Sequence, residues 1–375
     1  MTQPPARKIP LLIASTLKPI RDVRAFGKLA RSLGETNTYE LNIIGFSPKK
    51  PESEPGIRFF SSMGHFGSRP DRLLSQLRFL KCLLQVRPKI LLCCSYELLP
   101  LASFWKPILG YKLVYDVQEN YRANLDLNPT LSSAAKSRAA KLIQSAEDTD
   151  RIDLYLLAEK CYLNEMPEKT PCLVLENKFR GEVQPTQPIQ FLDKRSFRFC
   201  ITGTITPAFG IWEAVTWFET ILPVYPVSTL EIIGHCPLDD FGAKLAQASR
   251  QNPQIKLRLD SAPIAHEALI HTLKKADFAL LPYQSHPAID GKMPTKLFEC
   301  AALGIPVLVS PSPPWVDFLK PFAGGHSVDF STPSTALSQF EAALGKTFFT
   351  SPAPQSVLWK TQSAQLQQTF AKLLF

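Results

Sequence analysis

The chain has 375 residues, of which 45% are hydrophobic and 20% charged, a composition typical of folded proteins rather than of disordered ones. This length exceeds what a single hydrophobic core usually organises and suits two domains. The formal net charge of +9 favours phosphate-rich partners, but the positive residues are spread along the chain and form no dense tract of the kind that nucleic-acid binding favours.

The sequence indicates neither a membrane span nor a metal site. No stretch reaches the roughly 18 uncharged apolar residues that a spanning helix needs. The apolar run after Lys8 is short and lacks a small-residue cleavage site, which favours a buried first strand over a signal peptide. The eight cysteines show no paired CxxC spacing and the six histidines no H-E-x-x-H pattern. We therefore expect buried thiols in a reducing compartment, no metal, and a cytoplasmic protein.

Short apolar runs alternate with longer amphipathic stretches through the first half of the chain. Strands are predicted at 9–15, 41–46, 57–60, 90–94, 112–116, 153–157 and 172–175, and helices at 21–33, 70–86, 98–109 and 131–146. Such alternation predicts βαβ units and a parallel sheet that helices cover on both faces.

A polar segment with Gly181, Pro185 and Pro188 interrupts the alternation between residues 177 and 190. We expect it to be the linker between two domains. The alternation then resumes, with strands predicted at 197–203, 229–234, 255–259, 277–282 and 305–310, and helices at 211–222, 238–251, 264–275 and 294–303.

The predicted fold class is α/β, with two Rossmann-like doubly wound domains facing across a cleft. The first domain spans residues 1–180 and the second spans residues 181–350. Residues 351–375 contain a last helix, expected at 352–373, which should cross back and pack on the first domain. Its apolar side chains recur at near-helical spacing, namely Leu358, Leu366, Phe370 and Leu374.

The most informative segment, residues 293–307, reads MPTKLFECAALGIPV. Pro294 suits the first turn of a helix, and Gly304 suits the position just after its end. The i, i+3, i+4 spacing predicts a buried stripe of Leu297, Cys300 and Ala301. Glu299 lies off this stripe, and its carboxylate can accept hydrogen bonds from two ribose hydroxyls, while Lys296 and the first-turn amides attract phosphate. A solvated Glu299 and Lys296 on an exposed helix face is the open alternative.

This segment resembles the donor-binding helix of glycosyltransferase family 4, in which K-L-F-E is followed by small residues, Gly, Pro and Val. Four further segments resemble motifs of the same family in the same order along the chain. They are 95–102, with an acidic residue before L-P-L-A; 115–121, similar to Y-D-x-H-E; 230–237, similar to L-x-I-x-G-x-x-P; and 276–283, similar to A-D-x-x-L-x-P-Y. The set covers most of the chain and resembles the two-domain glycosyltransferase fold called GT-B.

The resemblance implies retaining transfer of a sugar from a nucleotide diphosphate to an acceptor hydroxyl, without a metal or other cofactor. The second domain would hold the nucleotide sugar. The first would hold a saccharide or lipid-linked acceptor, in the synthesis of cell-surface polysaccharide, lipopolysaccharide or glycolipid. Glu299 would bind the ribose, and the other implied donor-binding residues are Lys296, Thr295, Pro294, Met293, Lys292, Gly291, Gly203, Thr204 and Gly234. The implied catalytic positions are Gln118, Glu119 and Asp290.

The chain departs from the family pattern at the donor loop. Gly291 stands where the family has the first Glu of a Glu-x7-Glu spacing that ends at Glu299, and Asp290 is the neighbouring carboxylate. Thr204 and Phe209 stand at the positions of the family's basic pair. The charge of a diphosphate must then be met by helix amides together with Lys292 or Lys296.

A third departure is Gln118, which replaces the usual His of the first domain. Glutamine can bond to sugar hydroxyls but cannot take a proton near neutral pH. This is compatible with a mechanism in which the phosphate leaving group helps to deprotonate the acceptor, and it excludes a histidine base at this position.

The loop after the first strand has no glycine before Gly27, so we predict no dinucleotide site there. Its cations are candidates to meet an anionic acceptor such as a lipid pyrophosphate; they are Lys18, Arg21 and Arg24. Solvated charges at a helix start are the alternative. Glu97 either orients the acceptor hydroxyl or simply begins its helix.

Aromatic and basic residues in the first domain predict peripheral attachment to an anionic surface at the inner face of the cell membrane. They are Phe59, Phe60, Phe66, Phe79, Arg58, Arg69, Arg72 and Arg78. Alternatives to a transferase are a nucleotide-sugar epimerase or phosphorylase on the same scaffold and a non-catalytic two-lobed nucleotide-sugar binder. A further alternative, a nucleic-acid-binding protein, is supported only by the positive net charge of the chain.

Overall fold

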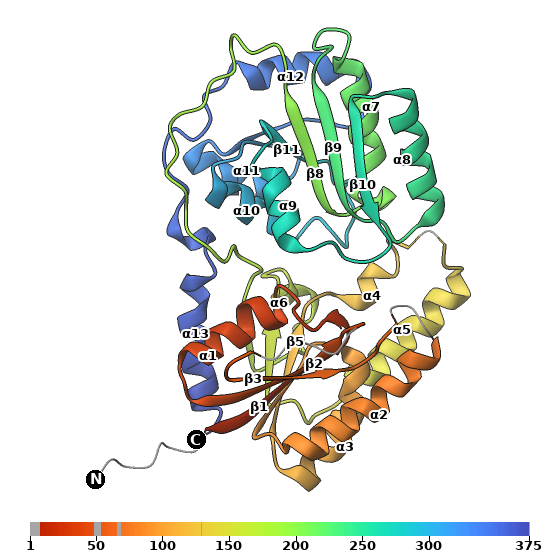
Figure 1. Ribbon diagram of the computed structural model, residues 1–375, viewed down its shortest axis with the longest axis vertical. Helices are drawn as coiled ribbons and strands as arrows, with labels where there is room; N and C mark the ends of the chain where they lie inside the picture. Colours follow the sequence, from red (N-terminus) through yellow and green to blue (C-terminus); the bar gives the residue numbers. More distant parts are fainter. Residues whose placement is uncertain (1–7, 49–53, 66–68, 129, 375) are drawn as a thin grey trace. The chain divides into compact units, whose positions relative to one another are not determined.

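Figure 1 shows the computed structural model, which describes residues 8–48, 54–65, 69–128 and 130–374. The chain divides into two compact units. One contains residues up to 180 together with those from 359 onwards, and the other contains residues 181–358. Each unit is a parallel sheet covered by helices on both faces, so the predicted α/β class with two doubly wound domains is confirmed.

The sheet of the first unit has seven strands within the described ranges, in the order β3-β2-β1-β4-β5-β6-β7, and every pair runs parallel. The strands are β1 (Ile9–Pro19), β2 (Tyr39–Phe46), β3 (Ile57–Ser61), β4 (Ile90–Cys93), β5 (Lys112–Val117), β6 (Leu154–Leu157) and β7 (Cys172–Val174). Their nearly continuous apolar sequences are typical of strands that are buried on both faces.

Two apolar layers cover the two faces of this sheet. The chain winds from β1 toward β3 and then from β4 toward β7 in the other direction, so right-handed crossovers place the helices of the two windings on opposite faces. One layer contains α1 (Arg31–Glu35) and α13 (Lys360–Lys372), and the other contains α2 (Arg69–Val86) and α3 (Leu99–Leu109). The helix α5 (Ser133–Glu147) contacts α3 on the second of these faces.

The predicted helix at 21–33 differs from the structure. Residues Ala25–Ala30 form a π-helix, η1, which leads into α1. Its wider turns are seen in the bonds from Gly27 N to Asp22 O and from Leu29 N to Arg24 O, both 2.9 Å. The Asp22 carboxylate accepts from the amides of Arg24 and Ala25 at 2.9 and 2.8 Å. Short π-helical turns are rare, and they occur often at functional sites.

The sheet of the second unit has six strands in the part of the chain that is described, in the order β10-β9-β8-β11-β12-β13, all parallel. The strands are β8 (Arg198–Thr204), β9 (Thr229–His235), β10 (Ile255–Asp260), β11 (Phe278–Leu281), β12 (Val307–Val309) and β13 (Gly325–Ser327). Its longer helices are α7 (Ile211–Ile221), α8 (Asp239–Gln251), α9 (His266–Leu273), α10 (Thr295–Leu303), α11 (Pro313–Leu319) and α12 (Ala336–Leu344). The Phe340 ring lies 5.1 to 5.9 Å from those of Phe197, Phe199 and Phe278, which fills the core with aromatic contacts.

The last helix belongs to the first unit, as expected, but it begins later than predicted. Trp359 Nε1 donates to Ser32 Oγ at 2.8 Å, and Leu366 and Phe370 are fully buried in the core below α1. Leu358 instead belongs to the second unit. The polar segment 177–190 is attached to the second unit over part of its length, since Gln184 N donates to Ala302 O and Ile189 pairs with Phe348.

Several short elements were not predicted from the sequence. They are α4 (Tyr121–Asn124), α6 (Tyr162–Glu165), α11, β13 and α12. Most are too short to show a period, and α11 begins with two prolines. All eight cysteines are free and six of them are buried, as expected. No helix within the described ranges has both the length and the apolar content of a membrane span.

Candidate functional site

Two glycines bring the ends of β8 and β9 into close contact in the second unit. Gly203 has a φ of 116°, a conformation that residues with a Cβ atom rarely adopt. Gly234 lies opposite Gly203, and a Cβ atom on it would lie 1.9 Å from the Gly203 carbonyl oxygen. A Cβ atom on Gly203 would lie 3.7 Å from Lys296 Cε, so the Lys296 side chain lies near this turn. Three of the predicted donor residues therefore converge from β8, β9 and α10.

Glu299 lies at the centre of a charged cluster beside this turn. Its Oε2 accepts from Lys296 Nζ at 2.7 Å, one helical turn away in α10. Its Oε1 lies 2.7 Å from His266 Nε2, at the first residue of α9. The side chains of His266 and Lys296 are 26% and 15% exposed, whereas that of Glu299 is 2% exposed. The carboxylate is thus enclosed by two groups that themselves reach solvent.

The alternative that Glu299 is solvated on an exposed face of its helix is wrong, because Glu299 is buried. Every residue of α10 from 297 to 302 is buried. A short helix covered on all sides has no solvent face, and the spacing of apolar residues cannot distinguish it from a helix covered on one side. Glu299 is a buried carboxylate that keeps its charge through its neighbours.

The charge of Glu299 is held by its two partners. Burial alone raises the pKa of a carboxyl group, because it penalises the ionised form. The positive charge of Lys296 and the hydrogen bonds from Lys296 and His266 outweigh burial and lower the pKa of Glu299 to about 2. Glu299 is therefore ionised at neutral pH and available as an acceptor of hydrogen bonds.

A small pocket lies next to this cluster. It is lined by the later residues of β8 and β11 and by Thr202, Thr204, Phe209, Tyr283 and Lys296. The rings of Phe209 and Tyr283 lie 4.8 Å apart at its edge. The hydroxyl Oγ1 of Thr202 is buried and has no partner among the described residues. The pocket thus offers a cation, two aromatic rings and a hydroxyl group at the carboxyl ends of parallel strands, where such folds bind ligands.

The loop before α10 is held by its own bonds. Asp290 accepts from Ser285 Oγ at 3.0 Å and from His286 N at 2.9 Å, so its carboxylate is directed back at the loop. The Lys292 carbonyl accepts from Trp315 Nε1 at 2.7 Å. The predicted donor residues Gly291, Met293, Pro294 and Thr295 lie along this loop and at the start of α10, with Pro294 as the N-cap residue. Asp290 thus has a structural role in the turn besides the proposed catalytic one.

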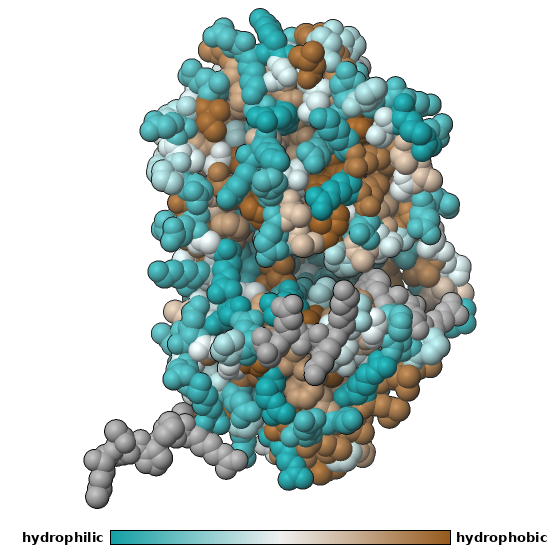
Figure 2. Space-filling view, viewed as in Figure 1, coloured by the Kyte–Doolittle hydropathy of each residue, from teal (hydrophilic) through white to brown (hydrophobic). Residues whose placement is uncertain are grey.

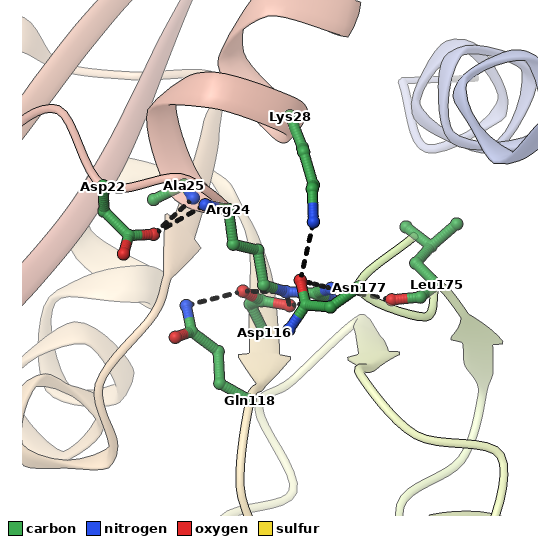
Figure 3. A network of polar contacts seen from close by, with 8 residues as sticks. All are labelled: Asp22, Arg24, Ala25, Lys28, Asp116, Gln118, Leu175 and Asn177. Atoms are coloured by element: carbon green, nitrogen blue, oxygen red, sulfur yellow. Dashed lines mark hydrogen bonds and ion pairs between the residues drawn. The ribbon is translucent and has the colours of Figure 1, made fainter. Parts of the chain in front are cut away.

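A second charged network lies inside the first unit (Figure 3). Arg24 and Asp116 form a salt bridge of 2.7 Å, and their side chains are 4% and 0% exposed. Arg24 Nη1 also donates to the Leu175 carbonyl at 2.7 Å and to Asn177 Oδ1 at 3.2 Å. Lys28 Nζ lies 3.4 Å from the same Asn177 oxygen. The network ties the π-helix to the ends of β5 and β7.

This network orients Gln118. The Gln118 amide nitrogen Nε2 donates to Asp116 Oδ2 at 2.9 Å. Both Asp116 oxygens accept bonds from Arg24, so the group that Gln118 turns toward them is its donor, the amide NH2. The amide orientation is therefore determined, and Oε1 is the atom that Gln118 presents on its other side. Glu119 accepts from Asn124 Nδ2 at 2.7 Å and lies 3.9 Å from Lys18 Nζ.

The predicted acceptor residues do not gather at one place. Lys18 lies beside Glu119 and hence near Gln118. Arg21 pairs with Glu54 at 3.8 Å and lies over the rings of Phe26 and Phe59. Glu97 pairs with Arg72 of α2. Arg24 was a candidate to meet an anionic acceptor, but it is buried and forms a salt bridge with Asp116. Of the predicted acceptor cations, only Lys18 is placed next to the predicted catalytic pair.

Sequence reasoning missed two residues of these clusters. His266 lies 33 residues before Glu299 with no recognisable spacing, so only the packing of α9 against α10 brings them together. Asn177 was counted as part of a linker, although it binds Arg24. Asp116 stands within the recognised segment 115–121, and a charged residue at the end of a buried strand was the available signal.

Among the residues that the structure describes, no group of three or more His, Cys, Asp or Glu is placed to hold a metal ion. No family model matches the chain, and no curated protein matches it.

Solved structures do resemble the chain over nearly its whole length. Sucrose-phosphate synthase from Thermosynechococcus elongatus is 11% identical, with a TM-score of 0.72 over 98% of this chain and 99% of that one. HepE from Anabaena, in complex with UDP-glucose, is 12% identical, with a TM-score of 0.63 over 97% and 100%. WaaG, a glycosyltransferase involved in lipopolysaccharide biosynthesis, is 12% identical, with a TM-score of 0.61 over 96% and 95%.

At such low identity the likeness concerns the fold. Each of these proteins matches both units of the chain in one alignment, rather than one Rossmann-like domain alone. The chain has the GT-B fold of these glycosyltransferases.

Proposed function

We propose that the chain is a glycosyltransferase that moves a sugar from a nucleotide diphosphate to an acceptor hydroxyl with retention of configuration. The observation that carries this proposal is the ionised Glu299 between Lys296 and His266, beside the glycine turn of β8 and β9. A carboxylate next to a cation, at the carboxyl end of a parallel sheet, suits a ribose followed by phosphates. The fold neighbour HepE was solved with UDP-glucose, which supports this ligand class.

Donor binding at Glu299 requires an exchange of partners. Both of its oxygens accept a bond in the structure, and its side chain is nearly inaccessible. His266 is the more exposed partner and begins its helix, so its side chain can turn away without disturbing the core. The ribose hydroxyls would then take the place of His266 at Oε1, while Lys296 would stay near Oε2 and face the phosphates. The remaining phosphate charge would be met by Lys292 and the first amides of α10, and no metal cofactor is proposed.

The first unit would supply the acceptor side of the reaction. The bond between the anomeric carbon and the phosphate oxygen breaks, and the acceptor oxygen joins the same face of that carbon. The acceptor proton passes to the departing diphosphate, because Gln118 cannot take a proton near neutral pH. Gln118 would hold a sugar or acceptor hydroxyl through Oε1, in the orientation that Asp116 determines. Glu119 and Asp290 are further candidates at the reacting centre.

The acceptor is proposed to be a saccharide or a lipid-linked molecule, in the synthesis of cell-surface polysaccharide, lipopolysaccharide or glycolipid. One fold neighbour, WaaG, is described as acting in lipopolysaccharide biosynthesis. We place the reaction at the cytoplasmic face of the cell membrane. Lys18, beside Glu119, is the acceptor-side cation next to Gln118.

A thermal-shift panel of UDP, ADP, GDP and their sugar conjugates tests the donor site. A ligand present at a hundred times its dissociation constant stabilises the folded protein by about 2.7 kcal/mol, which a melting curve resolves. Stabilisation by one nucleotide and its conjugates, followed by slow release of sugar from that conjugate, is the expected result. No response to any nucleotide at millimolar concentration would contradict the proposal.

A non-catalytic nucleotide-sugar binder is the second candidate. It is favoured by Gly291 in place of a carboxylate and by Asp290, whose oxygens are engaged within their own loop. A binder would be stabilised by the same conjugate but would release no sugar from it over many hours, with or without added acceptors.

A further inference from the structure

Apolar side chains are exposed on the outer side of the first unit. Five large ones are at least 60% exposed, namely Leu73, Leu77, Phe104, Ile108 and Leu142. They lie on α2, α3 and α5, which cover the same face of the sheet. Figure 2 shows apolar side chains gathered at the lower right of the view, where Figure 1 places α2 and α3. We call this surface the outer helical face.

The exposed residues form stripes rather than isolated positions. On α2, Leu73, Leu77, Lys81 and Leu84 follow one another at steps of four, four and three residues, all exposed. On α3, Pro100, Phe104 and Ile108 recur every four residues and are exposed as well. Each helix therefore has a second apolar stripe opposite the one that packs on the sheet. A contiguous apolar surface of this kind marks an interaction site.

Cations outnumber acids on the outer helical face, although four of them form salt bridges, namely Arg72 with Glu97, Arg78 with Asp71, Lys106 with Asp153 and Lys136 with Asp126. The sequences of α2, α3 and α5 contain eight Lys and Arg and two acidic residues. Both acids are turned inward, Asp71 to the amides of Gly64 and His65 and Glu147 to Lys169. Lys81 lies within the stripe of α2 and Lys141 lies beside Leu142, and both are exposed. The face thus combines exposed leucines with outward cations.

The combination of exposed leucines and cations indicates what kind of partner binds the outer helical face. A second copy of the same face would bring one set of positive charges against another, which opposes self-association. A membrane with anionic headgroups accepts both features at once, since apolar side chains enter the headgroup boundary while Lys and Arg remain at the phosphates. Charge complementarity therefore favours an anionic lipid surface.

We propose that the outer helical face docks the protein on an anionic membrane. This corrects the attachment site expected from the sequence. Phe79 is buried in the core, and Phe59 and Phe60 pack against the two core layers of the first unit. Phe66 lies outside the described residues, and the side chain of Arg69 is likewise not described. Membrane contact through Leu73 and Leu77 of α2 and Phe104 and Ile108 of α3 replaces contact through the predicted aromatic cluster.

The inference deepens the proposed function by naming the surface that brings the enzyme to a lipid-linked acceptor, but its test does not depend on donor binding. Flotation of the full chain with vesicles is measured with phosphatidylcholine alone and with an equal mixture of phosphatidylcholine and phosphatidylglycerol. We expect binding to the mixture only, decreasing as salt rises from 0.05 to 0.5 M because the lysine contacts are screened.

Two paired variants separate the apolar and charged contributions. Leu73→Ser with Leu77→Ser and, separately, Lys81→Glu with Lys141→Glu should each weaken vesicle binding by about ten-fold or more. Leu192→Ser with Val227→Ser is the matched control, since both residues are similarly exposed in the second unit. The control should bind as the unchanged protein does, and all variants should keep its melting temperature within a few degrees.

Three results would overturn the inference. They are equal binding to neutral and anionic vesicles, an equal loss in the control, and a dimer in sedimentation velocity that Leu73→Ser with Leu77→Ser dissociates. The nucleotide panel on the same variants keeps the two proposals apart. Vesicle binding without a response to any nucleotide would reject the donor site alone. A response to a nucleotide without vesicle binding would reject the outer helical face alone.

Discussion

The two units each contain a nearly inaccessible carboxylate paired with a cation, but the surroundings differ. Asp116 and Arg24 are both inside the first unit and are bonded to three further residues, Leu175, Asn177 and Gln118. Glu299 is equally buried, yet its partners Lys296 and His266 reach solvent. A carboxylate whose partners are buried acts as a scaffold, because no ligand can replace them. A carboxylate whose partners reach solvent can exchange them for a ligand. Depth of burial alone does not distinguish structural from binding carboxylates.

The largest effect is expected when the buried salt bridge between Arg24 and Asp116 is removed. Arg24→Met leaves the buried Asp116 carboxyl group without its main partner, which should lower the free energy of unfolding of the first unit by about 3–5 kcal/mol. Urea denaturation followed by circular dichroism measures this. Arg58→Met removes an exposed cation that pairs with Glu40 at 3.6 Å and should change the same quantity by less than about 1 kcal/mol. Equal effects of the two substitutions would contradict the distinction.

The pH dependence of stability should report the Glu299 cluster. The pKa of Glu299 is lowered from 4.5 to about 2, so its contribution is present above pH 4.5 and is lost as the pH falls toward 2. Between the unchanged protein and Glu299→Gln we expect a difference in unfolding free energy of about 3 kcal/mol at pH 7 that disappears near pH 2. The pKa values of Asp71 and Asp329 are also lowered, and they affect both proteins alike. A difference that stays constant across this window would exclude a charged, paired Glu299.

The same substitution should weaken nucleotide binding. Loss of a charge-assisted hydrogen bond to the ribose corresponds to roughly 1.5–3 kcal/mol, or about ten- to a hundred-fold in the dissociation constant. Titration calorimetry with the nucleotide that stabilises the protein best measures this at pH 7, where the variant remains folded. Glu267→Gln is the control, because it lies beside His266 on α9 and is exposed. Unchanged affinity in Glu299→Gln would place the donor elsewhere.

The role of Gln118 should appear in turnover rather than in donor affinity. Gln118→Met keeps the length of the side chain and removes the carbonyl acceptor, so we expect sugar release or transfer to slow by about ten-fold. The donor dissociation constant should not change, since Gln118 lies in the unit that is proposed to bind the acceptor. Gln144→Met, on the exposed side of α5, is the control for the substitution itself. A variant with full turnover would remove Gln118 from the proposed mechanism.

The smallest expected effect tests whether a bound ribose takes the place of His266 at Glu299. If the ribose displaces His266 from Glu299, His266→Ala removes a competitor, and nucleotide affinity should stay the same or rise by a few-fold. His271→Ala, on the exposed side of the same helix, is the comparison. A loss of affinity of about ten-fold in His266→Ala alone would show that His266 contacts the nucleotide directly.

Local patterns were sufficient to predict most of the architecture. Strands such as β2 and β9 and helices such as α2 and α10 are found within two residues of their predicted bounds. Their signals are apolar periods and flanking Pro and Gly residues, which act over a few neighbouring positions. The π-helix η1 was not predictable in this way, because its bonds to Asp22 and Arg24 depend on where the side chains of those residues are held. The elements α11 and β13 are too short to show a period.

Only the local features of the candidate site could be predicted from the sequence. The sequence by itself determined which residues carry charge at the ends of strands and helices, and it predicted that Glu299, Lys296, Gly203 and Gly234 belong to one site. The tertiary structure decided that Glu299 is buried, that His266 is its partner, and that Arg24 serves Asp116 rather than a ligand. These pairs are 33 and 92 residues apart in the chain. A contact across such a distance depends on how sheets and helices pack, and no periodic pattern of neighbouring residues contains that information.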